Sequence, residues 1–386
     1  MAEGARMSRP LKILQLQNRY NVSASDLAEQ VIEGLPAGQY EVTTAFLRGR
    51  PAAGEPESRA VRSIYFEFDK GATKGLRLGP LWALYKHCRD QRYDAIIVHR
   101  FKPISMLMLL NRWLRVPACI GVLHGLGEYD RAYRRWAMRA LITPAWRLVG
   151  VSRAVRDDLL HCGAGLADAQ VRQINNAIDI DRAERLQHSR EDARERLGLD
   201  PGRFIFGTIG RLVPVKGHIH LLEAFARIRH DHPQAMLAII GEGRSRAELE
   251  ALIARHDMQD QVRLLGSRDD ALQYVRAFDV FVMPSTSEGL PLALLEGMSG
   301  RLPVVGSDID SLRPILEDCG GRVFPSGNAQ ALAACLTDVL ALPQEQRAAE
   351  GERAYAYLRA AHSIETFRCQ YKGLLDELLV QGGWRG

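Results

Sequence analysis

The chain has 386 residues, and at roughly 100–200 residues per domain this length predicts two domains rather than one. Hydrophobic residues make up 46% and charged residues 25% of the sequence, a composition that excludes a disordered chain and a solenoid of repeats. Residues 1–180 carry 26 Lys and Arg against 17 Asp and Glu, a net charge of +9, and the remainder carries −4. The basic first half favours an anionic acceptor or an acidic surface such as lipid headgroups, with a solvated basic face as the alternative.

The cysteines and the apolar segments indicate a cytoplasmic chain. The six cysteines lie far apart without a C-x-x-C pair, which argues against a zinc site and against a disulfide framework. The N-terminal segment MAEGARMSRP has no apolar region after its charges, so we expect no secretory signal. The longest apolar run, 104–110, is far shorter than the roughly 20 residues of a membrane span.

Short apolar runs alternate with amphipathic segments along the first half of the chain. The runs are LKILQL from Leu11, AIIV from Ala95, ACIGVL from Ala118 and RLVGV from Arg147, and a helical pattern follows each one. Strands and helices that alternate with short turns predict a parallel sheet with helices on both faces.

The same series restarts after the turn at 200–202, with the runs FIFGTI, AMLAII, VRLL, DVFVM and LPVV. A charged and turn-rich boundary lies in 177–203. We therefore predict an α/β protein with two doubly wound, Rossmann-like domains that face a cleft. The first domain is expected over residues 1–180 on the acceptor side, the second over 181–360 on the donor side, and a C-terminal helix in 361–386 is expected to pack back on the first.

The strongest functional pattern is PSTSEGLPLALLEGM, in which seven residues separate Glu288 from Glu296 and a helix is expected to begin near Gly289 and Leu290. Ligands of doubly wound sheets bind beyond the carboxyl ends of the strands, and a helix start offers free N–H groups to a phosphate. Eight residues are about two helical turns, so Glu296 is expected to return to the face below Glu288. Such a pair can hold hydroxyls at two ends of an extended ligand, and two solvated helix glutamates are the alternative.

A second cluster, GRLVPVKG, follows the run FIFGTI. Arg211 and Lys216 flank a turn before a helix expected near His218, and Gly210 and Gly217 allow the backbone to approach a ligand closely. Two cations at a strand end can neutralise a diphosphate, arginine through its planar fork and lysine as a point charge. A surface pair without function is the alternative.

On these motifs the chain resembles the retaining GT-B glycosyltransferases that carry E-x7-E, known as glycosyltransferase family four. The resemblance covers nearly all of the second half and more loosely the first. It implies that Glu288 contacts the donor sugar, that Glu296 holds the ribose hydroxyls, and that Arg211 and Lys216 neutralise the diphosphate.

The same resemblance implies further contacts to the donor. His124, in GVLHGLGEYD, matches a histidine that faces the donor sugar and stabilises its developing positive charge, although a lone histidine in an apolar context is more often structural. Backbone at the helix start is expected to touch the sugar and the diphosphate, and VRLLGS to lie alongside the nucleobase. The predicted binding residues therefore also include Gly210, Leu265, Gly289, Leu290, Pro291 and Leu292.

Two loops depart from the family pattern. The first strand leads into LQLQNRYNVSASDL, which has no glycine where the family usually has Gly-Gly. After LPVVGSD the chain has Asp310 and Ser311 where the family commonly has two glycines, and Pro314 in the place of its glutamate. We therefore assign no donor contact to either loop.

The segment 128–142, EYDRAYRRWAMRALI, predicts a helix with one basic face and one apolar stripe. The arginines lie four residues apart, and the stripe combines aromatic with aliphatic side chains: Arg131, Arg135 and Arg139; Tyr133, Trp136, Ala137 and Leu141. Basic residues beside Trp and Tyr are typical of a helix in a membrane interface. A helix whose apolar stripe packs on the sheet is the alternative.

Together, the residues and the resemblance predict a metal-independent enzyme that moves a sugar, with retention, from a UDP-, GDP- or ADP-sugar to a glycan or lipid-linked acceptor. Lipopolysaccharide or another bacterial surface polysaccharide is the expected product, and the enzyme is placed in the cytoplasm or on the inner face of the cytoplasmic membrane. We expect no cofactor, no metal and no nucleic-acid partner. The alternatives are a nucleotide-sugar epimerase or phosphorylase on the same fold and a non-catalytic binding module, whereas no G-x-G-x-x-G follows a predicted strand, as an oxidoreductase would need.

Overall fold

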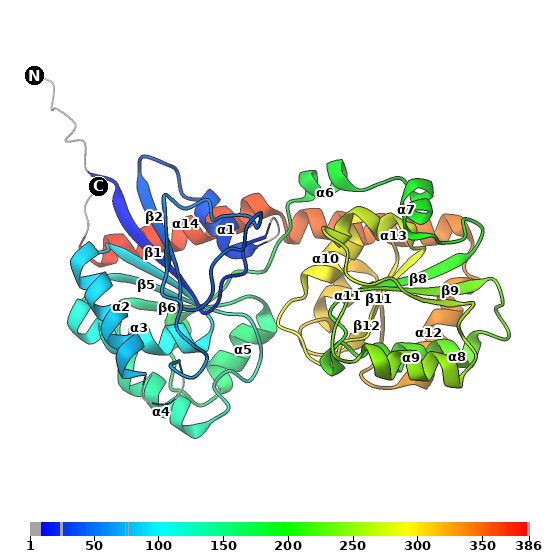
Figure 1. The fold of residues 1–386 in the computed structure, drawn as a ribbon, viewed down its shortest axis with the longest axis horizontal. Coiled ribbons are helices and arrows are strands. Elements are labelled where there is room, and N and C mark those ends of the chain that lie inside the picture. Colours follow the sequence, from blue (N-terminus) through cyan, green and yellow to red (C-terminus); the bar gives the residue numbers. More distant parts are fainter. Residues whose placement is uncertain (1–8, 24–25, 74, 76, 384–386) are drawn as a thin grey trace, which may run out of the picture. The chain divides into compact units, whose positions relative to one another are not determined.

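The computed structural model describes residues 9–23, 26–73, 75 and 77–383. The chain divides into two compact units, Met1–Asn175 with Ile364–Gly386, and Asn176–Ser363 (Figure 1). Each unit is built on a parallel sheet that alternates with helices along the chain. The predicted α/β class with two Rossmann-like domains is confirmed.

The first unit contains a seven-stranded parallel sheet in the order β3-β2-β1-β4-β5-β6-β7. Its strands are β1 (Leu11–Gln17), β2 (Tyr40–Phe46), β3 (Arg62–Tyr65), β4 (Ala95–His99), β5 (Ala118–Leu123), β6 (Trp146–Gly150) and β7 (Val171–Gln173). Every residue of β4 and β5 is buried, as expected for central strands of a sheet covered on both faces. The strand order reverses between β1 and β4, so their carboxyl ends form the edge where a ligand is expected.

The helices of the first unit include one from the far end of the chain. They are α1 (Leu27–Glu33), α2 (Leu78–Gln91), α3 (Phe101–Leu114), α4 (Ala132–Leu141), α5 (Arg153–His161), the short 3-10 helix η1 (Asp168–Gln170) and α14 (Ile364–Gln381). Helix α14 packs on α1 and β5. Its Arg368 comes so near α1 that a Cβ on Gly34 would lie 2.8 Å from the arginine Cβ, and the Tyr40 hydroxyl donates a hydrogen bond to Asp376.

The second unit contains a six-stranded parallel sheet in the order β10-β9-β8-β11-β12-β13. Its strands are β8 (Phe204–Ile209), β9 (Ala235–Ile240), β10 (Val262–Leu264), β11 (Val280–Met283), β12 (Val304–Asp308) and β13 (Arg322–Pro325). The order reverses between β8 and β11, which places the ligand-binding edge of this sheet at the loops that follow these two strands.

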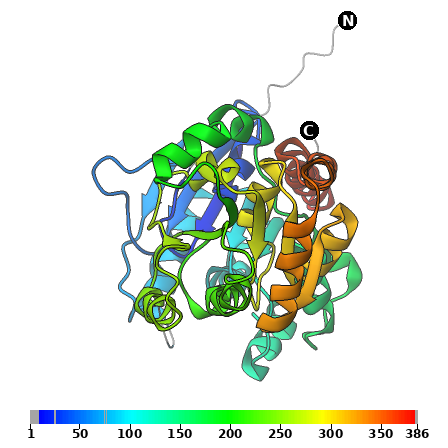
Figure 2. The same cartoon turned by 90° about the vertical axis from the view of Figure 1, so that its right-hand side faces the viewer.

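The helices of the second unit cover its sheet and close its core. They are α6 (Ile180–Leu186), α7 (Arg190–Leu197), η2 (Pro214–Lys216), α8 (His218–Ile228), α9 (Arg246–Arg255), η3 (Ala271–Ala277), α10 (Leu292–Ser299), α11 (Arg313–Cys319), α12 (Ala329–Ala341) and α13 (Gln344–Ala361). One core cluster joins α8, α9 and α12 to the strands through buried side chains such as Phe225, Leu249 and Leu332. Figure 2 shows α8 and α9 nearly end-on and side by side. Across the described residues, no helix is long and apolar enough to cross a membrane.

Candidate functional site

The loops that follow β8 and β9 are joined backbone to backbone at the carboxyl edge of the second sheet. The Leu212 N–H donates to the Glu242 carbonyl at 2.9 Å, and the Ser245 N–H donates to the Leu212 carbonyl at 2.9 Å. A Cβ on Gly241 would lie 1.9 Å from the Gly210 carbonyl oxygen, and one on Gly243 would lie 2.3 Å from that of Leu212. Only glycine permits these approaches, so the Gly241–Gly243 turn serves to hold the loop that carries Arg211.

The loop that follows β11 is held against the same loop. The Thr286 N–H donates to the Val215 carbonyl at 2.9 Å. Gly217 has φ 66° in the left-handed region, and a Cβ there would lie 1.9 Å from the Pro284 carbonyl oxygen. These contacts bring the end of η2 beside the loop that carries Glu288.

Lys216 and Glu288 form an ion pair, with 2.6 Å between the Lys216 Nζ and a Glu288 carboxylate oxygen. Their side chains are only 16% and 13% exposed, so water screens this pair weakly. The two groups come from different loops and are 72 residues apart in the sequence. The structure thus brings together two of the residues that the motifs single out.

The predicted helix start near Gly289 and Leu290 is wrong. Helix α10 begins at Leu292, and Pro291 precedes it in an extended conformation as its N-cap. Glu288 therefore lies in the loop, and the argument that two helical turns place Glu288 and Glu296 on one face does not apply. The backbone of the loop is fixed instead by Asn176, whose side-chain amide donates to the Leu290 carbonyl at 2.9 Å.

Glu296 lies on α10 and is partly buried. Burial raises the pKa of its carboxyl group to about 7, and Asp270 adds to the rise, whereas Arg182 and Lys216 oppose it. Arg182 forms an ion pair with Asp270, which limits how far its charge can lower the pKa of Glu296. Near neutral pH this carboxyl group can therefore accept or donate a hydrogen bond.

Arg211 and Leu265 lie in two further loops of this sheet, after β8 and β10. Arg211 is exposed, and within the described ranges its guanidinium has no hydrogen-bond or ion-pair partner. The Leu265 N–H donates to the Ile239 carbonyl at 2.9 Å, and the Gly241 N–H donates to the Gly266 carbonyl at 2.9 Å, so the loop after β10 adjoins the loop after β9. All predicted site residues of the second unit thus lie at or directly beyond the carboxyl edge of one sheet.

Two buried polar side chains at this edge were not singled out from the sequence. His218, the first residue of α8, is 4% exposed, and burial followed by the charge of Lys216 lowers its pKa to about 4. Its Nδ1 and the Oγ of the fully buried Ser285 have no hydrogen-bond partner among the described residues. The run of serines in PSTSEG was the available signal for Ser285, whereas nothing in the pattern marked His218 as more than a helix start.

His124 lies in the first unit, directly after β5, and pairs with a second histidine. Its Nε2 is 3.2 Å from the Nδ1 of His99, the last residue of β4, and its backbone N–H donates to Glu128 at 3.4 Å. Burial lowers the pKa of His99 to about 3, and burial followed by His99 and Arg100 lowers that of His124 well below 6.5. Both imidazoles are therefore neutral at pH 7.

The glycine-free loop after β1 brings more polar groups to the same edge of the first sheet. The Asp26 carboxylate accepts a hydrogen bond from the Ala28 N–H at 3.0 Å, and burial raises its pKa to about 6. Residues 24 and 25 of this loop lie outside the described residues. Asp26 and His99 are thus further candidates that the sequence patterns did not single out.

Helix α4 exposes the two aromatic side chains of the apolar stripe that the sequence predicts. Only Met138 of this helix is buried, whereas Trp136 is 71% and Tyr133 56% exposed. On its inner side the Arg134 guanidinium lies 4.4 Å from the centre of the Phe101 ring. The alternative interpretation, in which the stripe packs on the sheet, is therefore wrong for the two aromatic side chains.

Two family models match the chain, one in each unit. The family described as glycosyl transferases group 1 matches residues 189–357, and Glycosyltransferase Family 4 matches residues 25–182. Together these matches cover most of the chain. Among the described residues, no group of three or more His, Cys, Asp and Glu side chains is placed to hold a metal ion.

Curated relatives and solved structures are similar to the chain over different lengths. The UDP-Gal:alpha-D-GlcNAc-diphosphoundecaprenol alpha-1,3-galactosyltransferase of Escherichia coli is 26% identical over 60% of this chain, a match that spans 62% of its own length. The alpha-D-kanosaminyltransferase of Streptomyces kanamyceticus is 27% identical over 77% of this chain and 81% of its own. HepE of Anabaena, solved in complex with UDP, superimposes with a TM-score of 0.79 at 20% identity over 95% of this chain and 100% of its own.

Proposed function

We propose that this chain is a GT-B glycosyltransferase that transfers a sugar from a nucleoside diphosphate donor to a glycan or lipid-linked acceptor with retention of the anomeric configuration. The observation that carries the proposal is the Lys216–Glu288 ion pair at the carboxyl edge of the second sheet, where the loop after β8 also carries the exposed Arg211. A cation and an acid fixed next to each other suit a substrate in which an anionic diphosphate adjoins a hydroxylated sugar.

The two cations have their effect on the leaving group. When the bond between sugar and phosphate breaks, negative charge grows on the departing diphosphate, and donors already in place stabilise it without reorganisation. Lys216 is held by Glu288, whereas Arg211 is exposed and available to a ligand. In this proposal the diphosphate binds both cations and no divalent metal is needed, and Glu288 then accepts a hydrogen bond from a sugar hydroxyl.

Glu296 and the neutral histidines complete the proposed division of roles. A carboxyl group with a pKa of about 7 can hold two neighbouring ribose hydroxyls as acceptor and donor, which supports the role that the resemblance implies for Glu296. His124, neutral beside His99, offers a lone pair rather than a positive charge to a sugar with oxocarbenium character. We place the acceptor at the edge of the first sheet that carries these histidines.

The relatives suggest which donors and acceptors to try first. HepE was solved with UDP and with UDP-glucose, and the name of the E. coli relative specifies UDP-Gal and a sugar on diphosphoundecaprenol. We propose UDP-hexoses ahead of GDP- and ADP-hexoses, and an acceptor on the path to lipopolysaccharide or another surface polysaccharide.

The test is donor turnover with and without a diphosphate-linked isoprenoid sugar as acceptor. The proposal expects release of nucleoside diphosphate that depends on the acceptor, persists in EDTA and gives a product with the donor's anomeric configuration by NMR. An epimerase would change the sugar without releasing the nucleotide, and a phosphorylase would require inorganic phosphate. Donor binding without any turnover would leave only a binding module and would contradict the proposal.

We also propose that α4 binds the anionic face of the membrane that holds the acceptor. The exposed Trp136 and Tyr133 can enter the headgroup region, and the arginines of the helix complement anionic lipid. The combined Tyr133→Ala and Trp136→Ala change should abolish sedimentation with vesicles that contain phosphatidylglycerol. Trp82→Ala, at an equally exposed tryptophan of α2, is the matched control and should sediment as the wild type does. Equal sedimentation of the double variant would contradict a role for α4.

A further inference from the structure

The second unit contains a cavity at the amino edge of its sheet, opposite the edge that carries Lys216 and Glu288. The cavity has a volume of about 430 Å³, and its lining includes Phe204 at the start of β8, Asp279 just before β11 and Pro303 just before β12. Strand β8 has six residues, and at about 3.3 Å per residue the two edges of the sheet lie roughly 20 Å apart. The cavity is therefore separate from the candidate donor site.

Arginine dominates the charge of this cavity. Its lining holds a single acidic residue, Asp279, against five arginines: Arg190, Arg203, Arg276, Arg301 and Arg347. A cavity with such an excess of cations favours an anionic ligand because unlike charges attract.

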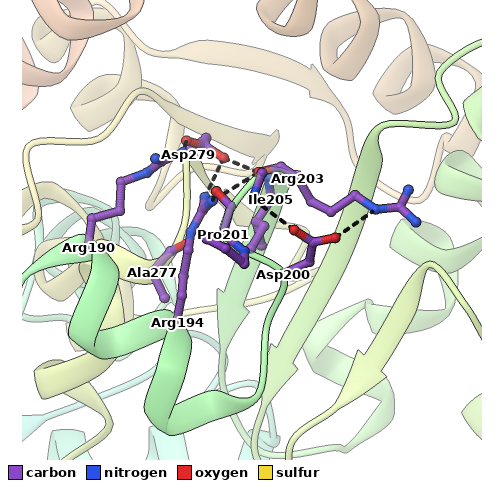
Figure 3. Close-up of polar contacts among 9 residues, drawn as sticks. Arg190, Arg194, Asp200, Pro201, Arg203, Ile205, Ala277 and Asp279 are labelled. Carbon is purple, nitrogen blue, oxygen red and sulfur yellow. Dashed lines mark hydrogen bonds and ion pairs between the residues drawn. The ribbon is translucent and has the colours of Figure 1, made fainter.

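The one aspartate is already fully engaged (Figure 3). One oxygen of Asp279 pairs with Arg190 at 2.7 Å, and the other pairs with Arg194 at 2.8 Å and accepts the Ile205 N–H at 2.7 Å. Arg194 itself is only 1% exposed and donates to the carbonyl groups of Ala277 and Pro201 at 2.9 and 2.7 Å. Both carboxylate oxygens of Asp279 are thus used in a structural network of ion pairs and hydrogen bonds. They cannot also neutralise the charge of the other arginines.

The remaining arginines differ in how their charge is balanced. Arg301 pairs with Glu352 at 2.6 Å, and Arg203 extends away from Asp279 toward Asp200 (Figure 3). Arg276 has no hydrogen-bond or ion-pair partner within the described ranges.

Arg347 also has no acidic partner among the described residues. Its guanidinium lies 5.0 Å from the centre of the Phe204 ring, and its hydrogen bonds go to the Leu340 and Leu342 carbonyl groups. Arg276 and Arg347 therefore bring two positive charges to the lining of one cavity without an acid to neutralise them.

We propose that this cavity is a second binding site, which takes an organic phosphate. Guanidinium groups bind phosphate through two parallel hydrogen bonds, and Arg276 and Arg347 are the arginines of the lining that have no acidic partner among the described residues. A volume of about 430 Å³ falls within the range of roughly 300–1,000 Å³ that small-molecule sites occupy, so the cavity also holds the organic part of the ligand. The site does not depend on the proposed transfer activity.

Calorimetric titration of the whole chain with glucose 6-phosphate, and separately with inorganic phosphate, tests the proposal. We expect the sugar phosphate to bind more tightly than the free ion. Arg276→Gln combined with Arg347→Gln should weaken binding at least about tenfold, as expected when charge-assisted hydrogen bonds to a phosphate are lost. The combined change of both arginines to lysine keeps the charge but removes the two parallel donors of each guanidinium. It should therefore bind more tightly than the glutamine variant but less tightly than the wild type.

Two controls decide where the ligand binds. Arg255→Gln, at an exposed arginine in the last turn of α9, removes one positive charge outside the cavity and should leave binding unchanged. Lys216→Ala removes a cation of the donor site and should also leave it unchanged. If the double glutamine variant still bound the ligand and the Lys216→Ala variant did not, the phosphate would belong to the donor site and the proposal would be overturned. Failure of the wild-type chain to bind either compound would overturn it as well, with circular dichroism confirming that each variant is folded.

Discussion

The side chains singled out at the carboxyl edges of the two sheets differ in their charge. In the second unit, loops joined through Gly217 hold an ionised pair, Lys216 and Glu288, in a weakly screened position. In the first unit, the corresponding edge carries His99 and His124, whose pKa values burial has lowered so far that both stay neutral. The comparison teaches that the second sheet keeps its charges in a fixed ion pair, whereas the two histidines of the first sheet lose theirs to burial.

The largest expected effect is on the turnover of variants at Lys216 and Arg211, at the carboxyl edge of the second sheet. Lys216→Ala and Arg211→Ala should each lower kcat roughly 10²–10³-fold, because each removes a preorganised donor to the leaving diphosphate. Arg211→Ala should leave the melting temperature unchanged, since this side chain is exposed and has no partner among the described residues. Arg255→Ala is the matched control, and a near-wild-type rate in either site variant would remove that residue from the proposed mechanism.

The next largest effect tests whether Gly217 holds together the loops at the carboxyl edge of the second sheet. Gly217→Ala should lower the free energy of unfolding by about 3 kcal/mol, because the new Cβ would lie 1.9 Å from the Pro284 carbonyl oxygen and the loops must separate. Gly198→Ala is the matched control, since Gly198 has φ 63° but no atom within 4 Å of the added carbon. There we expect only the backbone cost of about 1 kcal/mol. Equal losses in urea unfolding would show that the contact with Pro284 is unimportant.

Lowering the pH tests whether His99 is neutral in the folded chain. Because the folded chain binds fewer protons at His99 than the unfolded chain does, the stability that neutral His99 provides is lost as the pH falls from 6.5 toward about 3. His99→Asn should therefore lose less stability than the wild type over this interval, measured as the melting temperature at several pH values. Identical acid profiles would contradict the proposed burial of a neutral pair.

The smallest effect concerns Glu296, whose carboxyl group is kept protonated to a higher pH by burial. Its folded pKa of about 7 lies above the usual value of 4.5, so the folded chain holds the proton more tightly and stability falls as the pH rises between these values. Glu296→Gln should raise the melting temperature by a few degrees at pH 8 and leave it unchanged at pH 4. A gain that does not vary with pH would indicate a packing effect instead.

The fold class was predictable because strand and helix patterns are local. Runs such as AIIV at 95–98 and FIFGTI at 204–209 are strands, and α8 begins at His218 as expected. The start of α10 was missed because Glu288 continues into a loop that Pro291 ends, and the pattern of alternating apolar residues does not locate such a boundary.

The pairings within the site were not predictable from local pattern. Lys216 meets Glu288 across 72 residues and His99 meets His124 across 25, because adjacent strands of the sheet bring their ends together. Neither the ion pair nor the neutral imidazoles follow from residue spacing, since both depend on which strands are neighbours. The exposure of Trp136 likewise reflects packing, because a helical stripe looks the same whether it faces a sheet or solvent.

Helix α14 has a consequence for biosynthesis. The first unit begins the chain, yet α14, which packs on its α1 and β5, is made from residues 364–381, after the whole second unit. During translation the second unit can therefore complete its core while the first still lacks one of its helices. The first unit reaches its final packing only after residues 364–381 have left the ribosome, so premature termination before α14 would leave a folded second unit attached to an unfinished partner.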